Sequence, residues 1–232
     1  MAYPILTDNN TTERQRTGFL EIENLVKSYP TPDKGKFVVL NNINLTIGED
    51  EYISVIGHSG CGKSTLLKII GGFEKATSGS VRLEGKEIRK PGADRMMVFQ
   101  NYSLLPWLTV RENIRLAVDE VLKNANRAEK ITIVNEHLAM VNLTPAADKY
   151  PDEISGGIEQ RLGISSGLAS RPKRLLMDEP FGALDALTRG KLQRQVLDIW
   201  EHSRQAVMMI THDVDEAIYM SDRIILMTNG PS

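Results

Sequence analysis

The spacing of apolar and polar residues changes along the chain, and in the first part it predicts strands. Short apolar runs are separated there by loops rich in proline, glycine or asparagine. Such runs are typical of strands, so we expect strands at Phe19–Leu25, at Tyr52–Gly57 and at Arg95–Gln100. Phe37–Ile47 predicts a strand region with a turn at its Asn-Asn pair, and Lys63–Gly72 predicts a helix that ends at two glycines.

A helical pattern takes over between about residues 103 and 170. Thr109 is followed three residues later by Glu112, which is the capping box that starts many helices. A second helix is expected at about Arg127–Val141, and a third opens at Ser155 and runs to about Ser170. We therefore predict a helical subdomain over about 103–170, inserted between two strand-rich parts.

Strands and helices alternate in the rest of the chain. This alternation favours an α/β fold with a parallel sheet. We therefore predict one domain over 19–232. It has a mostly parallel sheet, an antiparallel β subdomain that precedes it in the chain, and the helical insertion. The expected elements of this last part are strands at Arg174–Asp178, Ala206–Thr211 and Arg223–Thr228 and helices at Ala186–Ser203 and Asp213–Ser221.

The composition argues against a nucleic-acid-binding protein. Such proteins carry an excess of basic residues, whereas this chain has a net charge of −2. Cys61 is the single cysteine, so no internal disulfide can form and a reducing compartment is expected. No apolar run approaches the roughly 18 residues that span a bilayer, and the N-terminus lacks the pattern of a signal peptide. We expect a cytoplasmic protein with a disordered tail over 1–18, whose membrane role comes only through a partner.

A glycine-rich stretch carries the first chemical motif. It fits G-x-x-x-x-G-K-[ST] without a gap and stands between an expected strand and an expected helix, as a P-loop requires. Glycines let backbone N–H groups turn toward phosphate oxygens, and the helix N-terminus adds its positive dipole end. Lys63 is expected to contact the β- and γ-phosphates and Ser64 to bind Mg²⁺, whereas His58 and Cys61 are interpreted as loop residues without chemistry of their own. The predicted nucleotide-binding residues are Gly57, His58, Ser59, Gly60, Cys61, Gly62, Lys63, Ser64 and Thr65.

Polar residues at other strand ends supply the rest of a candidate site, because ligands of open α/β sheets bind beyond the carboxyl ends of the strands. Asp178 ends one expected strand and is predicted to hold Mg²⁺, and Glu179 follows it as the acceptor that orients the attacking water. His212 follows a second strand and is predicted to contact the γ-phosphate. Gln100 ends a third strand, where it either senses Mg²⁺ and water or simply begins a loop.

Taken in this order, the motifs resemble those of the ATP-hydrolysing subunits of ABC transporters. The shared segments are "KSYP", "GHSGCGKST", "VFQ", "ISGG", "LLMDEP", "GALD" and "ITHD", and the resemblance covers roughly Phe19 to Thr228. It implies a P-loop NTPase core, ATP and Mg²⁺ as cofactors, and hydrolysis of ATP to ADP and phosphate. It also implies that Tyr29 stacks on the adenine, that Gln100 couples the nucleotide site to membrane subunits and that Asp185 lies in a loop crossing a dimer interface.

The resemblance also answers why a second glycine segment follows so far along the chain. In this family the segment Ser155, Gly156 and Gly157 does not bind the nucleotide held by its own P-loop. It caps the γ-phosphate held by the other subunit of a head-to-tail dimer, again with glycine backbone at a helix N-terminus. A second ATPase subunit, identical or different, is therefore an expected partner.

Longer segments are similar to importers of nitrate, nitrite, cyanate or bicarbonate, with sulfonate and taurine importers next. These are "PGADRMMVFQNYSLLPWLTVRENI", "EPFGALDALTRGKLQ" and "ITHDVDEAIYMSDRIILMTNGP". The resemblance implies membrane permease subunits, a substrate-binding protein, a place on the inner face of the plasma membrane and no nucleic acid. Asn101–Asn113 corresponds to the region that docks the permease, and Trp107 within it is either part of that surface or a packed core aromatic. The transported anion stays open.

The helix after "ISGG" departs from the family pattern. Glu159 stands where a lysine is common, Ser166 where an arginine is usual, and Gly163 and Gly167 where alanines are usual. Each glycine costs a helix about 1 kcal/mol relative to alanine, so Ile158–Gly167 is expected to loosen this helix. Two alternatives follow, an active ATPase and a weakened or regulatory partner in a heterodimer. A third class, a repair or translation factor, usually has two cassettes or long insertions, and the sequence has neither. Relatives usually continue for some tens of residues beyond the last expected strand.

Overall fold

The computed structural model describes residues 19–92, 94–99, 104–169 and 174–228, so the predicted tail over 1–18 and the candidate Gln100 lie outside the described residues. Two sheets form the framework. The first is antiparallel, with the strand order β2-β1-β4-β5, and the second is parallel, with the order β6-β7-β8-β3-β9. The strands are β1 (Leu20–Pro30), β2 (Lys36–Ile47), β3 (Tyr52–Gly57), β4 (Ser78–Leu83), β5 (Lys86–Glu87), β6 (Arg95–Val98), β7 (Arg174–Asp178), β8 (Ala206–Ile210) and β9 (Arg223–Met227). The predicted α/β fold with a mostly parallel sheet is confirmed.

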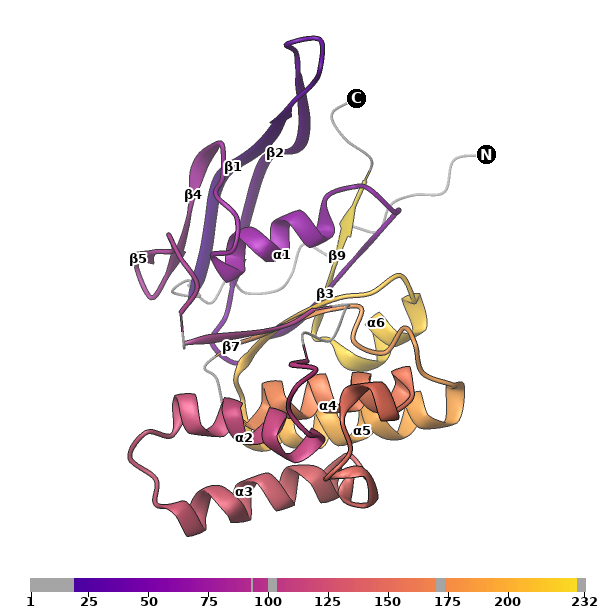
Figure 1. Cartoon of the computed structure of the whole chain (residues 1–232). Coiled ribbons are helices and arrows are strands. Elements are labelled where there is room, and N and C mark those ends of the chain that lie inside the picture. The colour runs from indigo at the N-terminus through magenta and orange to yellow at the C-terminus, as the bar shows by residue number, and fades with distance from the viewer. Residues whose placement is uncertain (1–18, 93, 100–103, 170–173, 229–232) are drawn as a thin grey trace.

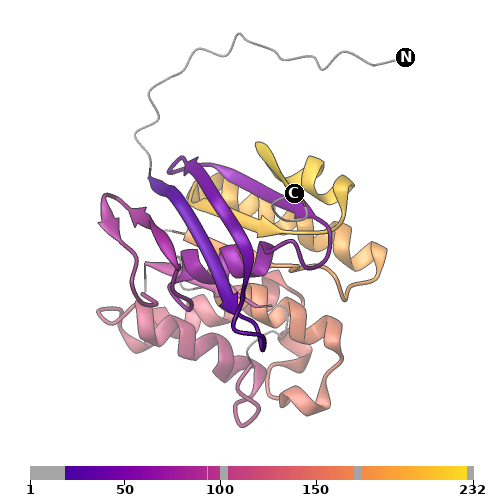
Figure 2. The ribbon, with the colours of Figure 1, turned by 90° about the horizontal axis from the view of Figure 1, so that it is seen from above.

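The helices form two groups on either side of the parallel sheet. Helix α1 lies between the two sheets, and α2 to α5 lie below the parallel sheet in Figure 1. Seen from above, the indigo strands β1 and β2 lie over the rest of the chain (Figure 2). The helices are α1 (Lys63–Gly71), α2 (Val110–Val121), α3 (Arg127–Met140), α4 (Gly156–Ala169), α5 (Ala186–Ser203) and α6 (Val214–Met220), with short 3-10 turns η1 (Thr144–Ala146) and η2 (Pro151–Glu153).

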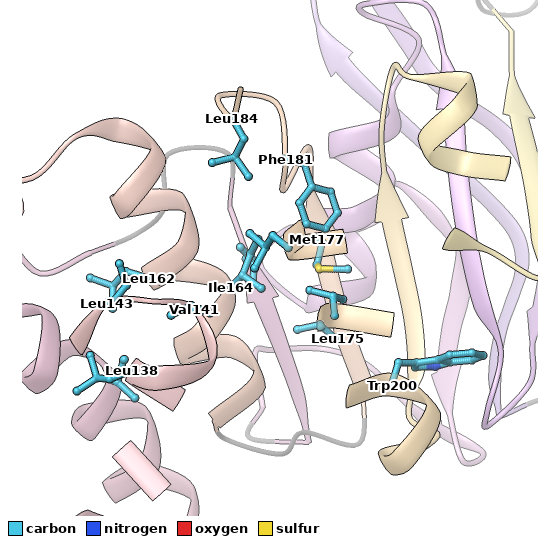
Figure 3. Packing of buried hydrophobic residues seen from close by; sticks show 14 of the residues in the cluster. Leu138, Val141, Leu143, Leu162, Ile164, Leu175, Met177, Phe181, Leu184 and Trp200 are labelled. Atoms are coloured by element: carbon cyan, nitrogen blue, oxygen red, sulfur yellow. The ribbon is translucent and has the colours of Figure 1, made fainter. Parts of the chain in front are cut away.

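Each side of the parallel sheet has its own hydrophobic core. Apolar residues of β1, β2 and β4 pack with α1 and with one face of the parallel strands. The other face packs against α2 to α5, where Leu138, Leu162 and Ile164 belong to one buried cluster with Leu175 and Met177 of β7, and Ile164 lies between the helices and Met177 (Figure 3). Strands β7 and β8 are buried along their whole length, and their apolar residues are consecutive (175–177 in β7 and 206–210 in β8) and not alternating, which is typical of a sheet covered on both faces.

The middle of the chain is helical, as predicted. Thr109 accepts a hydrogen bond from the Glu112 N–H, and the Glu112 carboxylate accepts one from the Thr109 N–H at 2.8 Å, which is the expected capping box at the start of α2. Helices α2, α3 and α4 pack on one another. The division of this stretch into a separate subdomain over about 103–170 stays a prediction. In the described part of the chain no helix is long and apolar enough to cross a membrane.

The prediction of a turn at the Asn-Asn pair was wrong. Strand β2 continues through Asn42, and the register against β1 shifts between the pairs Leu25–Ile43 and Lys27–Leu40. Asn42 adopts a left-handed backbone conformation with φ of 50°, which asparagine tolerates better than most residues. A bulge therefore accommodates the two asparagines without ending the strand.

Helix α4 is continuous over Gly156–Ala169, although loosening was expected there. A Cβ atom at Gly167 would lie 2.9 Å from Val98 Cγ2 on β6 and 3.3 Å from Leu175 Cδ1 on β7. This glycine therefore lets α4 approach the parallel sheet closely. Packing against the sheet stabilises the helix at the position where helix propensity alone is poor.

Candidate functional site

The glycine-rich loop Gly57–Thr65, called the phosphate loop from here on, connects β3 to α1 as predicted. Gly57 allows a close approach, because a Cβ there would lie 2.3 Å from the Met227 carbonyl oxygen of β9. Gly60 and Gly62 have φ of 83° and 100°, values that favour glycine. His58, Ser59 and Gly60 are exposed, whereas Cys61 is buried in the core between α1 and β2.

Lys63 lies across its own loop. Its Nζ donates to the carbonyl oxygens of Gly57 at 2.7 Å and His58 at 2.8 Å, and the residue is only 8% exposed. The ammonium is thus held beside the backbone turns that the glycines create. A phosphate group entering the loop would meet this positive charge together with the N-terminus of α1.

Ser64 and Asp178 meet, although 114 residues separate them. The Ser64 hydroxyl donates to Asp178 Oδ1 at 3.2 Å. Burial raises the pKa of the Asp178 carboxyl, the Ser64 hydrogen bond opposes this, and the charge of Glu179 adds to it. A hydroxyl and a carboxylate side by side are the hard oxygen ligands that Mg²⁺ prefers, so this pair fits a bound Mg²⁺. The structure thus brings the two residues together, and their role as metal ligands stays a prediction.

Glu179 follows directly on β7 in a strained conformation. Its φ of 49° lies in the left-handed region, which costs a non-glycine residue on the order of 1 kcal/mol. Two contacts hold the backbone in place: the Glu179 N–H donates to the Ile210 carbonyl of β8 at 2.9 Å, and Gln160 Nε2 donates to the Glu179 carbonyl at 3.3 Å. The strained residue thus lies directly beyond the carboxyl end of β7, at the predicted edge of the sheet.

His212 lies within reach of Glu179. Its Nδ1 is 3.4 Å from Glu179 Oε2, and its side chain is 68% exposed. Both residues follow neighbouring parallel strands, since β7 pairs with β8 from Arg174–Ala206 to Asp178–Ile210. The structure thus brings together two of the three residues predicted as catalytic, and the third, Gln100, lies outside the described residues.

Tyr29 lies near the far end of the phosphate loop. Its hydroxyl hydrogen-bonds with the Glu74 carboxylate and with the Thr65 side chain. Partial burial and then the Glu74 hydrogen bond raise the pKa of the Tyr29 phenol. The Lys27 ammonium lies 4.8 Å from the ring centroid, so a cation already covers one face of the ring. The other face is the one on which an adenine could stack, which stays a prediction.

The SGG segment, Ser155–Gly157, lies at the start of α4. Ser155 and Gly156 are exposed, and the Ser155 carbonyl accepts from the N–H groups of Ile158 at 2.8 Å and Glu159 at 3.0 Å. A Cβ at Gly156 would have no heavy atom within 4 Å. Among the described residues, no hydrogen bond joins this segment to the phosphate loop. The segment is an accessible helix N-terminus whose role in a partner's site stays a prediction.

Asp185 has a local role in addition to the predicted one. Its carboxylate accepts from the N–H groups of Leu187 at 3.1 Å and Thr188 at 3.0 Å, so it caps α5. The hydrogen bonds from Thr188 lower the pKa of this exposed carboxyl. Trp107 is 68% exposed, so the alternative of a packed core aromatic was wrong.

Gln160 is a residue whose position the sequence did not predict. It follows the SGG segment by one turn of α4, is only 1% exposed, and donates to the Glu179 carbonyl. The contact ties the helix that presents the SGG segment to the residue expected to orient water. The available signal was a polar side chain on an otherwise apolar helix face, but only the fold shows which residue it meets.

Comparisons with known proteins agree with this arrangement. A family model described as ABC transporter matches residues 40–182. The chain is 56% identical over 220 residues to the bicarbonate transport ATP-binding protein CmpD of Synechocystis, covering 95% of this chain and 78% of that protein. It is 55% identical to the nitrate import ATP-binding protein NrtC of Synechococcus elongatus, covering 92% of this chain but only 32% of NrtC. The chain thus spans about a third of the length of that second relative.

Solved structures give the same result. The post-hydrolysis dimer of the ATP-binding cassette MJ0796 bound to ADP and Pi superposes with a TM-score of 0.82 and 32% sequence identity, covering 90% of this chain and 94% of that one. A second dimeric structure of MJ0796, a bacterial ABC transporter cassette, gives 0.84 and 33%. These similarities extend over the whole described fold, including both sheets and the phosphate loop between β3 and α1. The chain belongs to the ABC transporter family, as an ATP-binding and ATP-hydrolysing cassette.

Proposed function

We propose that this cassette hydrolyses ATP at the edge formed by the phosphate loop, Asp178, Glu179 and His212, and that hydrolysis energises the import of a small inorganic anion. One observation carries the catalytic part. The Ser64–Asp178 contact of 3.2 Å and the Glu179–His212 contact of 3.4 Å lie at the carboxyl ends of neighbouring strands, beside the loop that holds Lys63. Phosphate binding, metal binding and water orientation are thus available within one edge of the sheet.

Each group has a role set by its chemistry. Lys63 and the N–H groups at the start of α1 attract and orient the phosphates of ATP. Ser64 and Asp178 hold Mg²⁺, which when bound neutralises charge on the phosphate oxygens. Glu179 accepts a hydrogen bond from the attacking water and aligns it with the γ-phosphorus, and His212 approaches the γ-phosphate from the next strand. Gln100 is proposed to contact Mg²⁺ or this water.

The site is proposed to be completed by a second ATPase subunit. The SGG segment is exposed, and N–H groups at a helix N-terminus attract anions, so it fits the γ-phosphate held by a partner. The dimeric MJ0796 structures support this arrangement. Asp185 would lie at the dimer interface, and Tyr29 would stack on the adenine.

A membrane permease is proposed to provide the path for the anion, with a substrate-binding protein delivering it from the other side. Asn101–Asn113 is the proposed docking region, and the exposed indole of Trp107 gives it an apolar contact. The cassette is accordingly proposed to lie at the cytoplasmic face of the membrane. Relatives that import bicarbonate and nitrate match at 56% and 55% identity, so they support a small inorganic anion and favour neither of the two.

Phosphate release by the full chain with ATP and Mg²⁺ tests the catalytic proposal. Glu179→Gln removes the acceptor for water while keeping the shape of the side chain, so turnover should fall by about 10²–10³-fold, with ATP binding retained. Glu201→Gln on the exposed face of α5 is the matched control and should leave turnover unchanged. Equal turnover in the Glu179→Gln variant and the native chain would contradict the role of Glu179. Binding of ATP without any turnover by the native chain would favour the weakened-partner alternative.

Uptake by vesicles containing the cassette and its permease tests the transport proposal. ATP-dependent uptake of labelled nitrate or bicarbonate, lost in the Glu179→Gln variant, is the expected result. Uptake of taurine or another sulfonate in place of both inorganic anions would contradict the proposed substrate class while leaving the catalytic proposal intact.

A further inference from the structure

Polar side chains of α5 contact the segment that follows His212 and the first turn of α6. Arg189 and Gln193 are one turn apart on α5, so their side chains lie on the same face of that helix. They meet Asp213, which caps α6, and Glu216 in the first turn of α6. Both contacts are between polar side chains, and His212 lies immediately before Asp213.

The inner of the two contacts is buried. Gln193 Nε2 donates to Glu216 Oε1 at 2.9 Å, and Glu216 is only 6% exposed. Glu216 also hydrogen-bonds with the Thr211 side chain. Thr211 Oγ1 accepts from the Asp213 N–H at 3.1 Å, and Asp213 Oδ1 accepts from the Glu216 N–H at 3.1 Å. This closed set of hydrogen bonds fixes the residues on both sides of His212.

The outer contact joins this set to the segment before α5. Arg189 Nη1 lies 3.3 Å from Asp213 Oδ2, and Arg189 Nη2 donates to the Leu184 carbonyl at 3.1 Å. Leu184 directly precedes Asp185, and its Cδ2 lies 3.4 Å from the Cβ position at Gly157 in the SGG segment. One guanidinium thus bridges the backbone beside Asp185 and the residue that follows His212.

We propose that Arg189 is a positioning residue for ATP hydrolysis, which holds His212 against Glu179 and transmits any displacement of the Leu184–Asp185 segment to it. The inference rests on the proposed function of that site. The His212 side chain is largely exposed, so its placement depends on the backbone behind it. A guanidinium with two fixed acceptors is rigid enough for this task, because its donors form a planar fork. Helix packing alone does not require that the same side chain also bind the Leu184 carbonyl.

Imidazole NMR signals of the full chain, together with turnover, test this proposal. The chain has four histidines, and the His212 signal is assigned as the one lost in His212→Gln. Arg189→Ala should shift or broaden the His212 signal and leave the other three unchanged. It should also lower kcat by about tenfold, with KM for ATP within twofold of its native value, because a small misplacement of a contact group slows the chemical step. Arg189→Lys keeps the charge and should restore part of the native His212 signal and part of the native kcat.

Two further variants separate positioning from folding. Arg194→Ala removes an exposed arginine of α5 whose guanidinium, among the described residues, hydrogen-bonds only with the Gly190 carbonyl of the same helix, and it should change neither readout. Asp213→Asn keeps a good N-cap for α6 but removes the charge that faces Arg189, and it should reproduce the effect of Arg189→Ala. The double variant should then be no worse than either single variant.

The outcomes distinguish this inference from the proposed function. An unchanged His212 signal and an unchanged kcat in both Arg189→Ala and Asp213→Asn would overturn the positioning role, even if Glu179→Gln abolishes turnover. Equal changes in Arg194→Ala would overturn it as well. A native chain that hydrolyses no ATP, but whose His212 signal still shifts in Arg189→Ala, would support the positioning contact and contradict the proposed function.

Discussion

The phosphate loop and the SGG segment are both glycine backbone at the start of a helix, but their surroundings differ. In the phosphate loop, a Cβ at Gly57 would overlap the Met227 carbonyl, and one at Gly62 would lie 2.8 Å from Leu40 Cδ2. Its functional side chains are already held inside the chain, Lys63 by the loop carbonyls and Ser64 by Asp178. In the SGG segment, Gly156 has open space around it.

This difference separates two reasons for a glycine. Gly57 is required by the fold of this chain, because β9 passes directly against it. Among the described residues no heavy atom lies within 4 Å of a Cβ at Gly156, so packing within this part of the chain does not explain the glycine, and Gly156 is open to a group that approaches from outside. That is the situation expected of a segment whose ligand is held by another subunit. The variants below change Gly57 of the phosphate loop and Asp178 beside it, Gly156 of the SGG segment, and Gly167 of the helix that presents this segment.

The largest effect on stability is expected from Gly57→Ala. The new methyl group would overlap a backbone carbonyl, which cannot rotate away, so overpacking should cost about 1–3 kcal/mol of unfolding free energy. At this chain length that corresponds to a fall in Tm of several degrees. Gly156→Ala is the matched control and should leave Tm nearly unchanged. Thermal melts of both variants test this prediction. Equal Tm values would contradict the claim that packing requires Gly57 but not Gly156.

A smaller loss is expected from Gly167→Ala. Helix propensity alone favours alanine by about 1 kcal/mol. The added Cβ would lie 2.9 Å from Val98 Cγ2, and the β-branched valine has little freedom to rotate away. We expect overpacking to win and the variant to lose about 1 kcal/mol in denaturant unfolding. A more stable variant would mean that α4 can move off the sheet and that Gly167 is a weak point of this helix.

The smallest effect is expected from Asp178→Asn in the ligand-free chain, and it depends on pH. Burial raises the pKa of Asp178 above its ordinary value, so between the two values the folded chain holds a proton that the unfolded chain has lost. Native stability therefore falls as pH rises through this interval. The asparagine variant does not titrate there, so its Tm relative to the native chain should increase with pH. A constant difference in Tm from pH 4 to pH 8 would contradict the raised pKa.

The order of apolar and polar residues predicted most helices and strands, because this order and the residues at helix ends can be read directly from neighbouring positions in the sequence. Helix α5 begins and ends where its pattern does, at Ala186 and Ser203. The Ser64–Asp178 contact could also be anticipated, since ends of parallel strands meet at one edge of the sheet. The prediction of a turn at Asn42 was wrong because a non-local interaction decides there. The pairing of β2 with β1 overrides the local preference for a turn.

The contacts behind the site could not be predicted in this way. Gln160 meets Glu179, Gln193 meets Glu216 and Arg189 meets Asp213 across 19 to 24 residues. No periodic pattern marks such pairs, because a polar residue on a helix gives the same signal whether it faces water or another polar group. Only the packing of α4, α5 and α6 against the strands decides which side chains meet.

The central claim is that the SGG segment completes the nucleotide site of a second subunit, and light scattering of the Glu179→Gln variant tests it most directly. With ATP and Mg²⁺ its mass should double from the 25.9 kDa of the single chain. Adding Gly156→Asp should prevent the doubling, because a carboxylate would then face the γ-phosphate, while Gly156→Ala should permit it. A variant that binds ATP yet stays a monomer, or that dimerises equally well with Gly156→Asp, would contradict the claim.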